Sequence, residues 1–250
     1  MPANRLSARL AAVLAAATAA ALAGTGCGVL RNEFSDTYSE RAAVTEVRID
    51  GGAGSVTVRP GSAAAVEITR TVRTTADKPD PTHHVDGAVL HLSTDCGRMC
   101  TASYEVLAPN RVKVSGRDGS GDITLTGVSA VDVTTGSGRI RVTDATGPVR
   151  VSAGSGEIDL TDVAGRTDAK TGSGNIDARE LRSEDVNLTA SSGNVELRLS
   201  VPADVRAATG SGNVTVAVPE GGAYRVDADT GSGDLRVDIH GHGKVGVWGV

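Results

Sequence analysis

The chain has 250 residues and a net charge of −5. Only 2% of the residues are aromatic, so the core must be built from Val, Ile, Leu and Ala. The sequence has neither a basic stripe nor a row of aromatic residues, which argues against nucleic acid as a partner. It also lacks the serine-nucleophile and dinucleotide motifs, and we expect no bound cofactor and no catalytic residues.

The N-terminus has the pattern of an export signal. Arg5 and Arg9 precede an apolar, alanine-rich segment at residues 10–23. This segment is too short to span a bilayer well and is typical of a secretory signal peptide. We therefore expect residues 1–26 to be a signal peptide and the mature protein to be extracytoplasmic.

The export signal runs into the sequence LAGTGC at residues 22–27. This stretch resembles the lipobox of bacterial lipoproteins, although Gly24 occupies a position where Leu is usual. The resemblance implies that Cys27 carries a lipid, which would attach the protein to the outer face of the cytoplasmic membrane. The alternative is an ordinary secreted protein that is cleaved nearby.

The other two cysteines, Cys96 and Cys100, lie in the sequence DCGRMC. An exported chain enters an oxidising compartment, where disulfides persist, so we expect these two cysteines to pair with each other. Two alternatives remain at this point. The cysteines could join His83, His84 and His91 in a metal site, although the spacing fits no standard zinc pattern, or they could be free thiols.

Residues 27–44 show no clean period and are predicted to be a lipid-anchored tether. From residue 45 onward, apolar and polar residues alternate as in strands with one buried face. We expect N-terminal coils and a cap at residues 45–113. The aperiodic region 75–110 and the last eleven residues, HGHGKVGVWGV, are the candidate caps.

Residues 114–250 contain one short motif seven times. The copies begin at Gly119, Gly136, Gly154, Gly172, Ser191, Gly210 and Gly231, and successive copies are 17, 18, 18, 19, 19 and 21 residues apart. In each copy a glycine-serine turn is followed by two apolar residues in alternation, and a second alternating pair lies later in the same coil. The sequence therefore predicts an all-β, single-stranded parallel β-helix (a β-solenoid) with about 18–21 residues per coil and no helices after signal removal.

The glycine-serine turns invite comparison with known ligand loops. The dinucleotide motif fails because its third glycine position holds Asp177 in the fourth copy, and no helix follows the turn to bind a phosphate. A repeated calcium site is disfavoured because Arg139 occupies one of the supposed aspartate positions. Asn175, Asn194 and Asn213 follow the turn in three consecutive copies, and we expect them to form a ladder of hydrogen bonds.

A candidate ligand face is formed by Asp159, Asp177 and Glu196, which take the outward position after the turn in consecutive copies. Stacked carboxylates repel one another unless they are solvated, paired with arginines or bridged by a cation. The face is therefore either a salt-bridged solvent surface or a carbohydrate site. His240 and His242 could chelate a metal, but a polar terminal turn is the simpler interpretation, and we expect no metal site.

The repeated SGxI/V-x-L unit, the stretch VRIDGGAGSVTVRPG and the stretch YEVLAPNRVKVSGRDGSGDITL together resemble a bacterial family called the toastrack domain or "putative adhesin" family. The resemblance extends from about Val44 to the C-terminus. It implies a β-helix that is exported or tethered to a membrane, without established catalytic residues. The resulting hypothesis is a non-enzymatic surface lipoprotein for adhesion, envelope sensing or binding of an envelope protein or glycan. The alternative is a carbohydrate-binding or carbohydrate-active protein that uses the acidic face.

Overall fold

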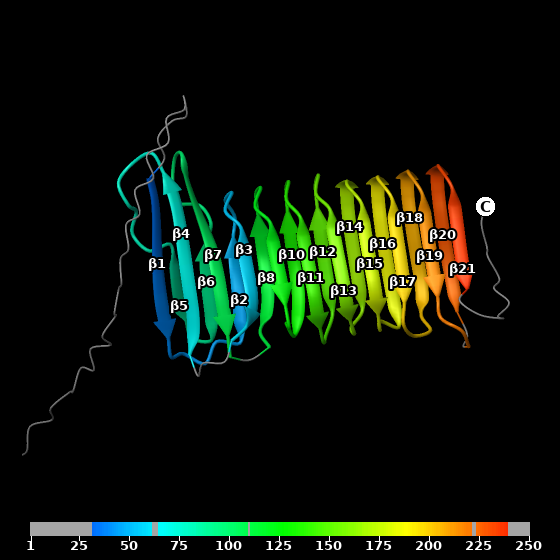
Figure 1. Cartoon of the computed structure of the whole chain (residues 1–250), viewed down its shortest axis with the longest axis horizontal. Coiled ribbons are helices and arrows are strands. Elements are labelled where there is room, and N and C mark those ends of the chain that lie inside the picture. The colour runs from blue at the N-terminus through cyan, green and yellow to red at the C-terminus, as the bar shows by residue number, and fades with distance from the viewer. Residues whose placement is uncertain (1–31, 62–64, 110, 222–223, 240–250) are drawn as a thin grey trace, which may run out of the picture.

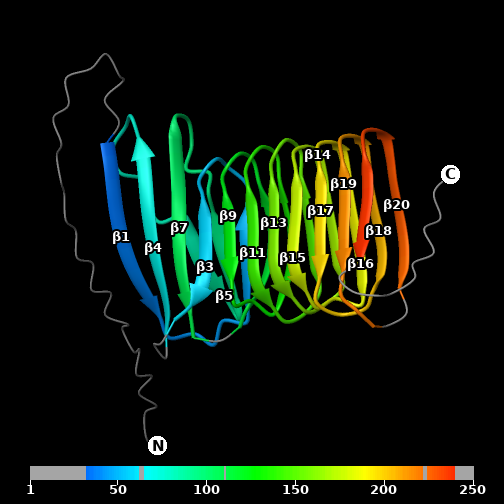
Figure 2. The same cartoon turned by 45° about the vertical axis from the view of Figure 1, so that its right-hand side comes forward.

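The computed structural model describes residues 32–61, 65–109, 111–221 and 224–239. All regular secondary structure in these ranges is β-strand. The strands form a long, flat stack (Figure 1) in which two sheets lie face to face (Figure 2). In the same ranges, no helix is long and apolar enough to cross a membrane.

Sheet A has eleven strands in the order β1-β4-β7-β3-β9-β11-β13-β15-β17-β19-β21. Their bounds are β1 Asn32–Glu40, β3 Val56–Pro60, β4 Val66–Thr74, β7 Cys100–Ala108, β9 Ile123–Thr126, β11 Ile140–Ala145, β13 Ile158–Val163, β15 Ile176–Leu181, β17 Val195–Leu199, β19 Val214–Val218 and β21 Leu235–Ile239.

Sheet B has ten strands in the order β20-β18-β16-β14-β12-β10-β8-β2-β6-β5. Their bounds are β2 Glu46–Asp50, β5 His83–Asp86, β6 Val89–Ser93, β8 Lys113–Asp118, β10 Ala130–Thr135, β12 Val149–Ala153, β14 Thr167–Ser173, β16 Asp185–Ser192, β18 Asp204–Ser211 and β20 Arg225–Ser232.

From β8 to β21 the chain alternates between the sheets, and every neighbouring pair within a sheet is parallel. The β-solenoid prediction is therefore confirmed. The residues predicted to point inward form the core: Ile123, Ile140 and Ile158 are stacked in register and fully buried. Backbone hydrogen bonds between the parallel strands set the spacing of adjacent coils at about 4.8 Å, and the branched side chains stack at the same spacing.

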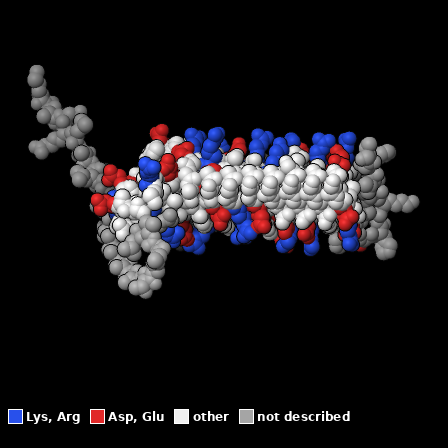
Figure 3. All heavy atoms as spheres, turned by 90° about the horizontal axis from the view of Figure 1, so that it is seen from above, with Lys and Arg blue, Asp and Glu red and all other residues white. Residues whose placement is uncertain are grey.

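The glycine-serine turns connect sheet B to sheet A along one edge of the stack. Backbone hydrogen bonds join successive turns, for example from Ser155 N to Gly136 O at 2.9 Å. The coils approach so closely there that a Cβ atom added at Gly156 would lie 1.8 Å from Gly138 O. Seen from above in Figure 3, this edge is an uncharged band with charged side chains along both flanks. The turns are thus structural corners.

The stack of turns continues one coil further than the seven copies found in the sequence. Strand β2 pairs with β8, β3 pairs with β9, and the turn between β2 and β3 joins the same edge. Gly119 N donates a hydrogen bond to Gly52 O at 2.9 Å. The motif is degenerate there, GGAGS in place of GSG, and strands β4 to β7 are inserted before the next coil.

The N-terminal end contains more regular strand structure than the sequence predicted. Residues 27–44 were expected to be a tether, but Asn32–Glu40 form strand β1, which pairs antiparallel with β4. The alternation of β1 is hard to recognise because its one buried side chain is Asp36, flanked by the partly buried Phe34 and Tyr38. The region 75–110, expected to be aperiodic, contains β5, β6 and β7.

Candidate functional site

The predicted ligand face lies on the outward side of sheet A. Asp159 on β13, Asp177 on β15 and Glu196 on β17 are paired in register across three neighbouring parallel strands. The period of the sequence brings these carboxylates together because each coil returns the same position to the same place. The three residues therefore form one continuous row.

Each carboxylate of this row has an arginine partner. Arg141 Nη2 lies 3.1 Å from Asp159 Oδ2, and Arg198 Nη2 lies 2.9 Å from Glu196 Oε1. Arg179 donates a hydrogen bond to Asp177. These pairs neutralise the repulsion expected between stacked like charges. The arrangement matches the salt-bridged surface considered in the sequence analysis.

Asp177 is the member of the row whose carboxylate has an oxygen without a hydrogen-bond partner among the described residues. Burial is the main cause that raises its pKa, and the neighbouring charges of Glu196 and Asp159 raise it further, while Arg179 and Arg198 act in the opposite direction. Its Oδ1 atom is buried and has no hydrogen-bond partner among the described residues. Asp177 therefore accepts a proton more readily than an ordinary aspartate.

The described residues contain no group of three His, Cys, Asp or Glu side chains that could hold a metal ion. His240 and His242, the other candidate chelators, lie outside the described residues, as does Cys27. In the acidic row, each of the three carboxylates forms an ion pair with an arginine.

The predicted asparagine ladder exists, but its bonds differ from the expected pairing between side-chain amides. The side-chain oxygen of Asn175 accepts a hydrogen bond from the backbone N of Asn194 at 2.9 Å, and Asn194 does the same for Asn213. Asn213 in turn accepts from the backbone N of Asp234. Each asparagine therefore fixes the corner of the following coil.

A second row of polar contacts at the turn edge was missed from the sequence. The buried hydroxyl of Thr171 donates to Gly156 O in the preceding turn at 2.9 Å, and Thr209 donates to Gly193 O at 2.8 Å. Both threonines stand directly before a turn motif. The recurring sequence Thr-Gly-Ser-Gly could have indicated these contacts.

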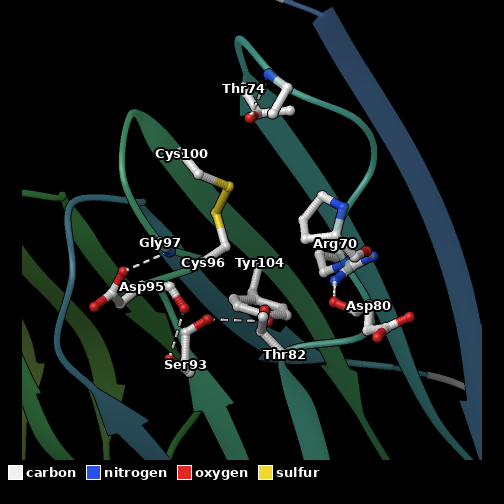
Figure 4. Close-up of a disulfide and its surroundings, with 12 residues drawn as sticks. Arg70, Thr74, Asp80, Thr82, Ser93, Asp95, Cys96, Gly97, Cys100 and Tyr104 are labelled. Carbon is white, nitrogen blue, oxygen red and sulfur yellow. Dashed lines mark hydrogen bonds between the residues drawn. A yellow bond between two sulfur atoms is a disulfide. The ribbon is translucent and has the colours of Figure 1, made fainter.

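Cys96 and Cys100 form the predicted disulfide, with their Cα atoms 5.4 Å apart. The bond closes the connection between β6 and β7 (Figure 4). In the same loop, Gly97 N donates to Asp95 Oδ1 at 2.8 Å. Because the two sulfur atoms are joined, the thiolate metal site considered in the sequence analysis is excluded.

The histidines proposed for that metal site have other neighbours. His83 packs edge-on against Tyr38, with ring centroids 4.4 Å apart, and His84 stacks on His91 at 4.6 Å. Burial, followed by the nearby charge of Arg70, lowers the pKa of His83. The neutral imidazole is thus an aromatic packing group at this end of the fold.

Arg70 is the most unusual residue that the sequence analysis did not identify. Its side chain is fully buried on the inward side of β4, beside β1, where it donates to Asp36 Oδ2 at 2.9 Å and to Asp80 O at 2.6 Å. Lys78 binds the same carboxylate. Burial alone would raise the pKa of Asp36, but the bonds and charges of Lys78 and Arg70 outweigh it and lower that pKa. The sequence could have indicated this buried ion pair, because Arg70 takes an inward position of β4, between Ile68 and Val72.

Comparison with known proteins agrees with this fold. Residues 105–218 match the model of the Toastrack DUF4097 family, which confirms the resemblance inferred from the sequence over that range. A comparison with curated proteins finds no match.

Two solved structures are similar to the chain. The first is described as a putative adhesin from Bacteroides fragilis, with a TM-score of 0.56 and 14% identity over 83% of this chain and 97% of that one. The second, a putative cell adhesion protein from Clostridium sporogenes, has a TM-score of 0.41 and 11% identity over 84% of this chain and all of the other. At these identities the likeness to the first structure shows a shared fold.

Proposed function

We propose that this protein is a non-enzymatic scaffold of the bacterial cell surface, anchored to the outer face of the cytoplasmic membrane through a lipid on Cys27. The observation that carries this proposal is the uninterrupted two-sheet stack, whose turn amides, asparagines and threonines are used to join coil to coil. Such a stack resembles a repeat scaffold, in which each unit contacts only its neighbours and long side faces remain available for partners. The adhesin names of the similar structures support a role in adhesion or in binding an envelope partner.

Cell fractionation tests the anchor. The wild-type chain should be recovered with membranes, whereas the full-length Cys27→Ala variant should be released into the extracytoplasmic fluid with its fold intact. Incorporation of a labelled fatty acid should occur in the wild type and be lost in the variant. Recovery of Cys27→Ala with membranes at the wild-type level would contradict a lipid anchor at this residue.

The scaffold role is tested by capturing envelope components with the released Cys27→Ala protein. Coated beads should retain a specific envelope partner or adhere to cells, and no envelope component should be consumed or cleaved. Degradation of an envelope polymer by the purified protein would contradict a non-enzymatic function.

The competing function is carbohydrate binding or cleavage at Asp159, Asp177 and Glu196. It is less well supported because each of these carboxylates is already bound by an arginine. Its test is the triple alanine variant of these residues, which should bind cell-wall glycans as the wild type does. Loss of glycan binding or cleavage in that variant would favour the competing function.

A further inference from the structure

We infer that the outward face of sheet B carries a binding site for an acidic polysaccharide, in a basin formed by strands β8, β10, β12 and β14. This inference rests on the proposed scaffold function and names the chemistry of a partner for it. The basin lies on the opposite side of the stack from the acidic row, because the outward surfaces of the two sheets point in opposite directions.

The basin arises because two smaller residues lie between two long cationic side chains along the stack. In the row farther from the turn edge, Lys113 and Arg166 enclose Ala130 and Pro148, and these four residues border one hollow of about 220 Å³. The two cations are three coils apart, which corresponds to about 14 Å at the usual strand spacing. Small residues thus form a low floor between two cationic ends.

A second hollow, of about 340 Å³, lies beside the first and nearer to the turn edge. Its outward side chains include Thr134 and Ser152, which are followed in register by Lys170. A central row of Asp132, Arg150 and Asp168 borders both hollows. The two hollows therefore form one basin with Arg150 at its centre.

Two cations of the basin, Arg150 and Lys170, are only loosely paired, whereas Arg166 Nη1 lies 3.2 Å from Asp185 Oδ2 and Lys113 Nζ lies 3.4 Å from Glu46 Oε2. Arg150 Nε lies 4.0 Å and Lys170 Nζ 3.7 Å from the single carboxylate of Asp168. Arg150, Arg166 and Lys170 have exposed side chains, with relative accessibilities of 69%, 68% and 55%. On sheet A, by contrast, the arginine partners of the acidic row form close hydrogen bonds with it. Exposed pairs at such distances contribute little to stability, so the cations of the basin can bind a ligand at small cost.

The mixture of groups in the basin selects the ligand. Lysine and arginine bind carboxylate, sulfate or phosphate groups. The carboxylates of Asp132 and Asp168 can only accept hydrogen bonds and would bind the hydroxyl groups of a sugar. Ala130 and Pro148 offer an apolar floor to the C–H face of a sugar ring. A chain of sugar rings with acidic groups satisfies all three features, whereas a simple polyanion has no hydroxyl groups to offset its repulsion by the two aspartates.

The test measures binding of the released Cys27→Ala protein to polygalacturonate, with fully methyl-esterified polygalacturonate as a neutral ligand of the same backbone. The basin variant is Arg150→Ala/Arg166→Ala/Lys170→Ala. The matched control is Arg141→Ala/Arg179→Ala/Arg198→Ala, which removes the same charge from the opposite face. Circular dichroism and thermal unfolding verify that both variants fold.

We expect the acidic polymer to bind and its methyl ester to bind at least about tenfold more weakly, since charge-assisted hydrogen bonds dominate the affinity. The basin variant should lose affinity by a similar factor, whereas the control should keep it within about twofold. Asp132→Ala should weaken binding of polygalacturonate but strengthen binding of polyglutamate, because it removes a hydrogen-bond acceptor and a repulsive charge together.

Equal losses in the two triple variants would overturn the inference, as would equal binding of polygalacturonate and its methyl ester. Preferential binding of polyglutamate or of anionic lipid vesicles would overturn it in favour of a peptide or a membrane partner. Membrane fractionation of the same variants, made with Cys27 intact, separates the two proposals. Normal anchoring with no glycan binding rejects the basin alone, and loss of anchoring in the wild type rejects the lipid-anchored scaffold.

Discussion

The two ends of this molecule differ in strand arrangement and in the composition of their cores. From β8 onward, parallel coils repeat the same contacts, and their core consists almost entirely of small apolar residues. The N-terminal end, with β1 and β4 to β7, is largely antiparallel and contains a buried arginine, two tyrosines, three histidines and the disulfide. The repeated part gains stability from coil stacking, whereas the end of the stack must be closed by specific polar and aromatic contacts, since an open strand edge invites aggregation. Five substitutions test this contrast.

The largest effect should come from Arg70→Met in the N-terminal end. Among the described residues, the change leaves the buried Asp36 with Lys78 as its one cationic partner, and breaking a buried ion pair typically costs about 3–5 kcal/mol. Urea denaturation measures the free energy of unfolding. Arg73→Met on the same strand, where the pair with Glu33 is exposed, should cost under about 1 kcal/mol. Equal losses of unfolding free energy in Arg70→Met and Arg73→Met would show that the buried ion pair does not hold β1 on the sheet.

Gly156→Ala should be the most damaging of the small changes in the coils. Its Cβ atom would lie 1.8 Å from Gly138 O, so the turns must separate, and we expect a loss of about 3 kcal/mol. Chemical denaturation of Gly156→Ala and Ser155→Ala provides the measurement and its control. If both variants unfold at the same denaturant concentration, the turns are not stacked as closely as the structure indicates.

Removal of the disulfide should have an intermediate effect. The bond closes a loop of only five residues, from Cys96 to Cys100, and the chain-entropy relation gives about 2 kcal/mol for a loop of this size. Cys96→Ser/Cys100→Ser should therefore lower the unfolding temperature moderately. Wild-type protein in reducing agent should show the same decrease, and the variant should not respond to reduction. A response of the variant to reduction would contradict this assignment.

Thr171→Val should cost about 1 kcal/mol, the usual contribution of one buried hydrogen bond. Thr171→Ser keeps the hydroxyl and is the matched control. Ala153 and Ala190 occupy the same position in the neighbouring coils, so the fold accommodates the loss of one hydroxyl. A Val variant as stable as the Ser variant would indicate that the threonine row does not stabilise the turns.

The smallest effect is expected at Asp177 and depends on pH. Its pKa is raised in the folded protein, so ionisation lowers stability as pH rises from the unfolded-state value of about 3.9 through the folded-state value. Asp177→Asn removes this penalty. The stability of Asp177→Asn relative to wild type should therefore increase between about pH 3 and pH 6, by under about 1 kcal/mol. Thr215→Asn, at the equivalent outward position, should show no such trend.

The repeat of 17–21 residues made most of the fold predictable from the sequence. Ile158 and Leu160 could be assigned to the core because the six other copies of the motif repeat their positions, and each copy supports the alignment of the next. The same logic brought Asp159, Asp177 and Glu196 together correctly. It could not show which arginine binds each carboxylate, since long side chains can reach along or across strands.

The N-terminal end could not be predicted in this way because it occurs once. Asp36 and Arg70 each occupy an inward position of a strand, where a charge normally argues against burial, and only their pairing makes the burial favourable. That pairing joins residues 34 positions apart on antiparallel strands. The basin on sheet B was likewise hidden, because it depends on small residues at outward positions as much as on the cations around them.

The contact between Gly156 and Gly138 O and its equivalents in other turns also make the length of the molecule adjustable in whole steps. Removal of residues 154–171 would place the turn at Gly172 directly on the turn at Gly136 and preserve every inward position. Each coil removed or added should shift the far end by about 4.8 Å without altering the faces of the remaining coils. The number of coils thus sets the length of the molecule in equal steps.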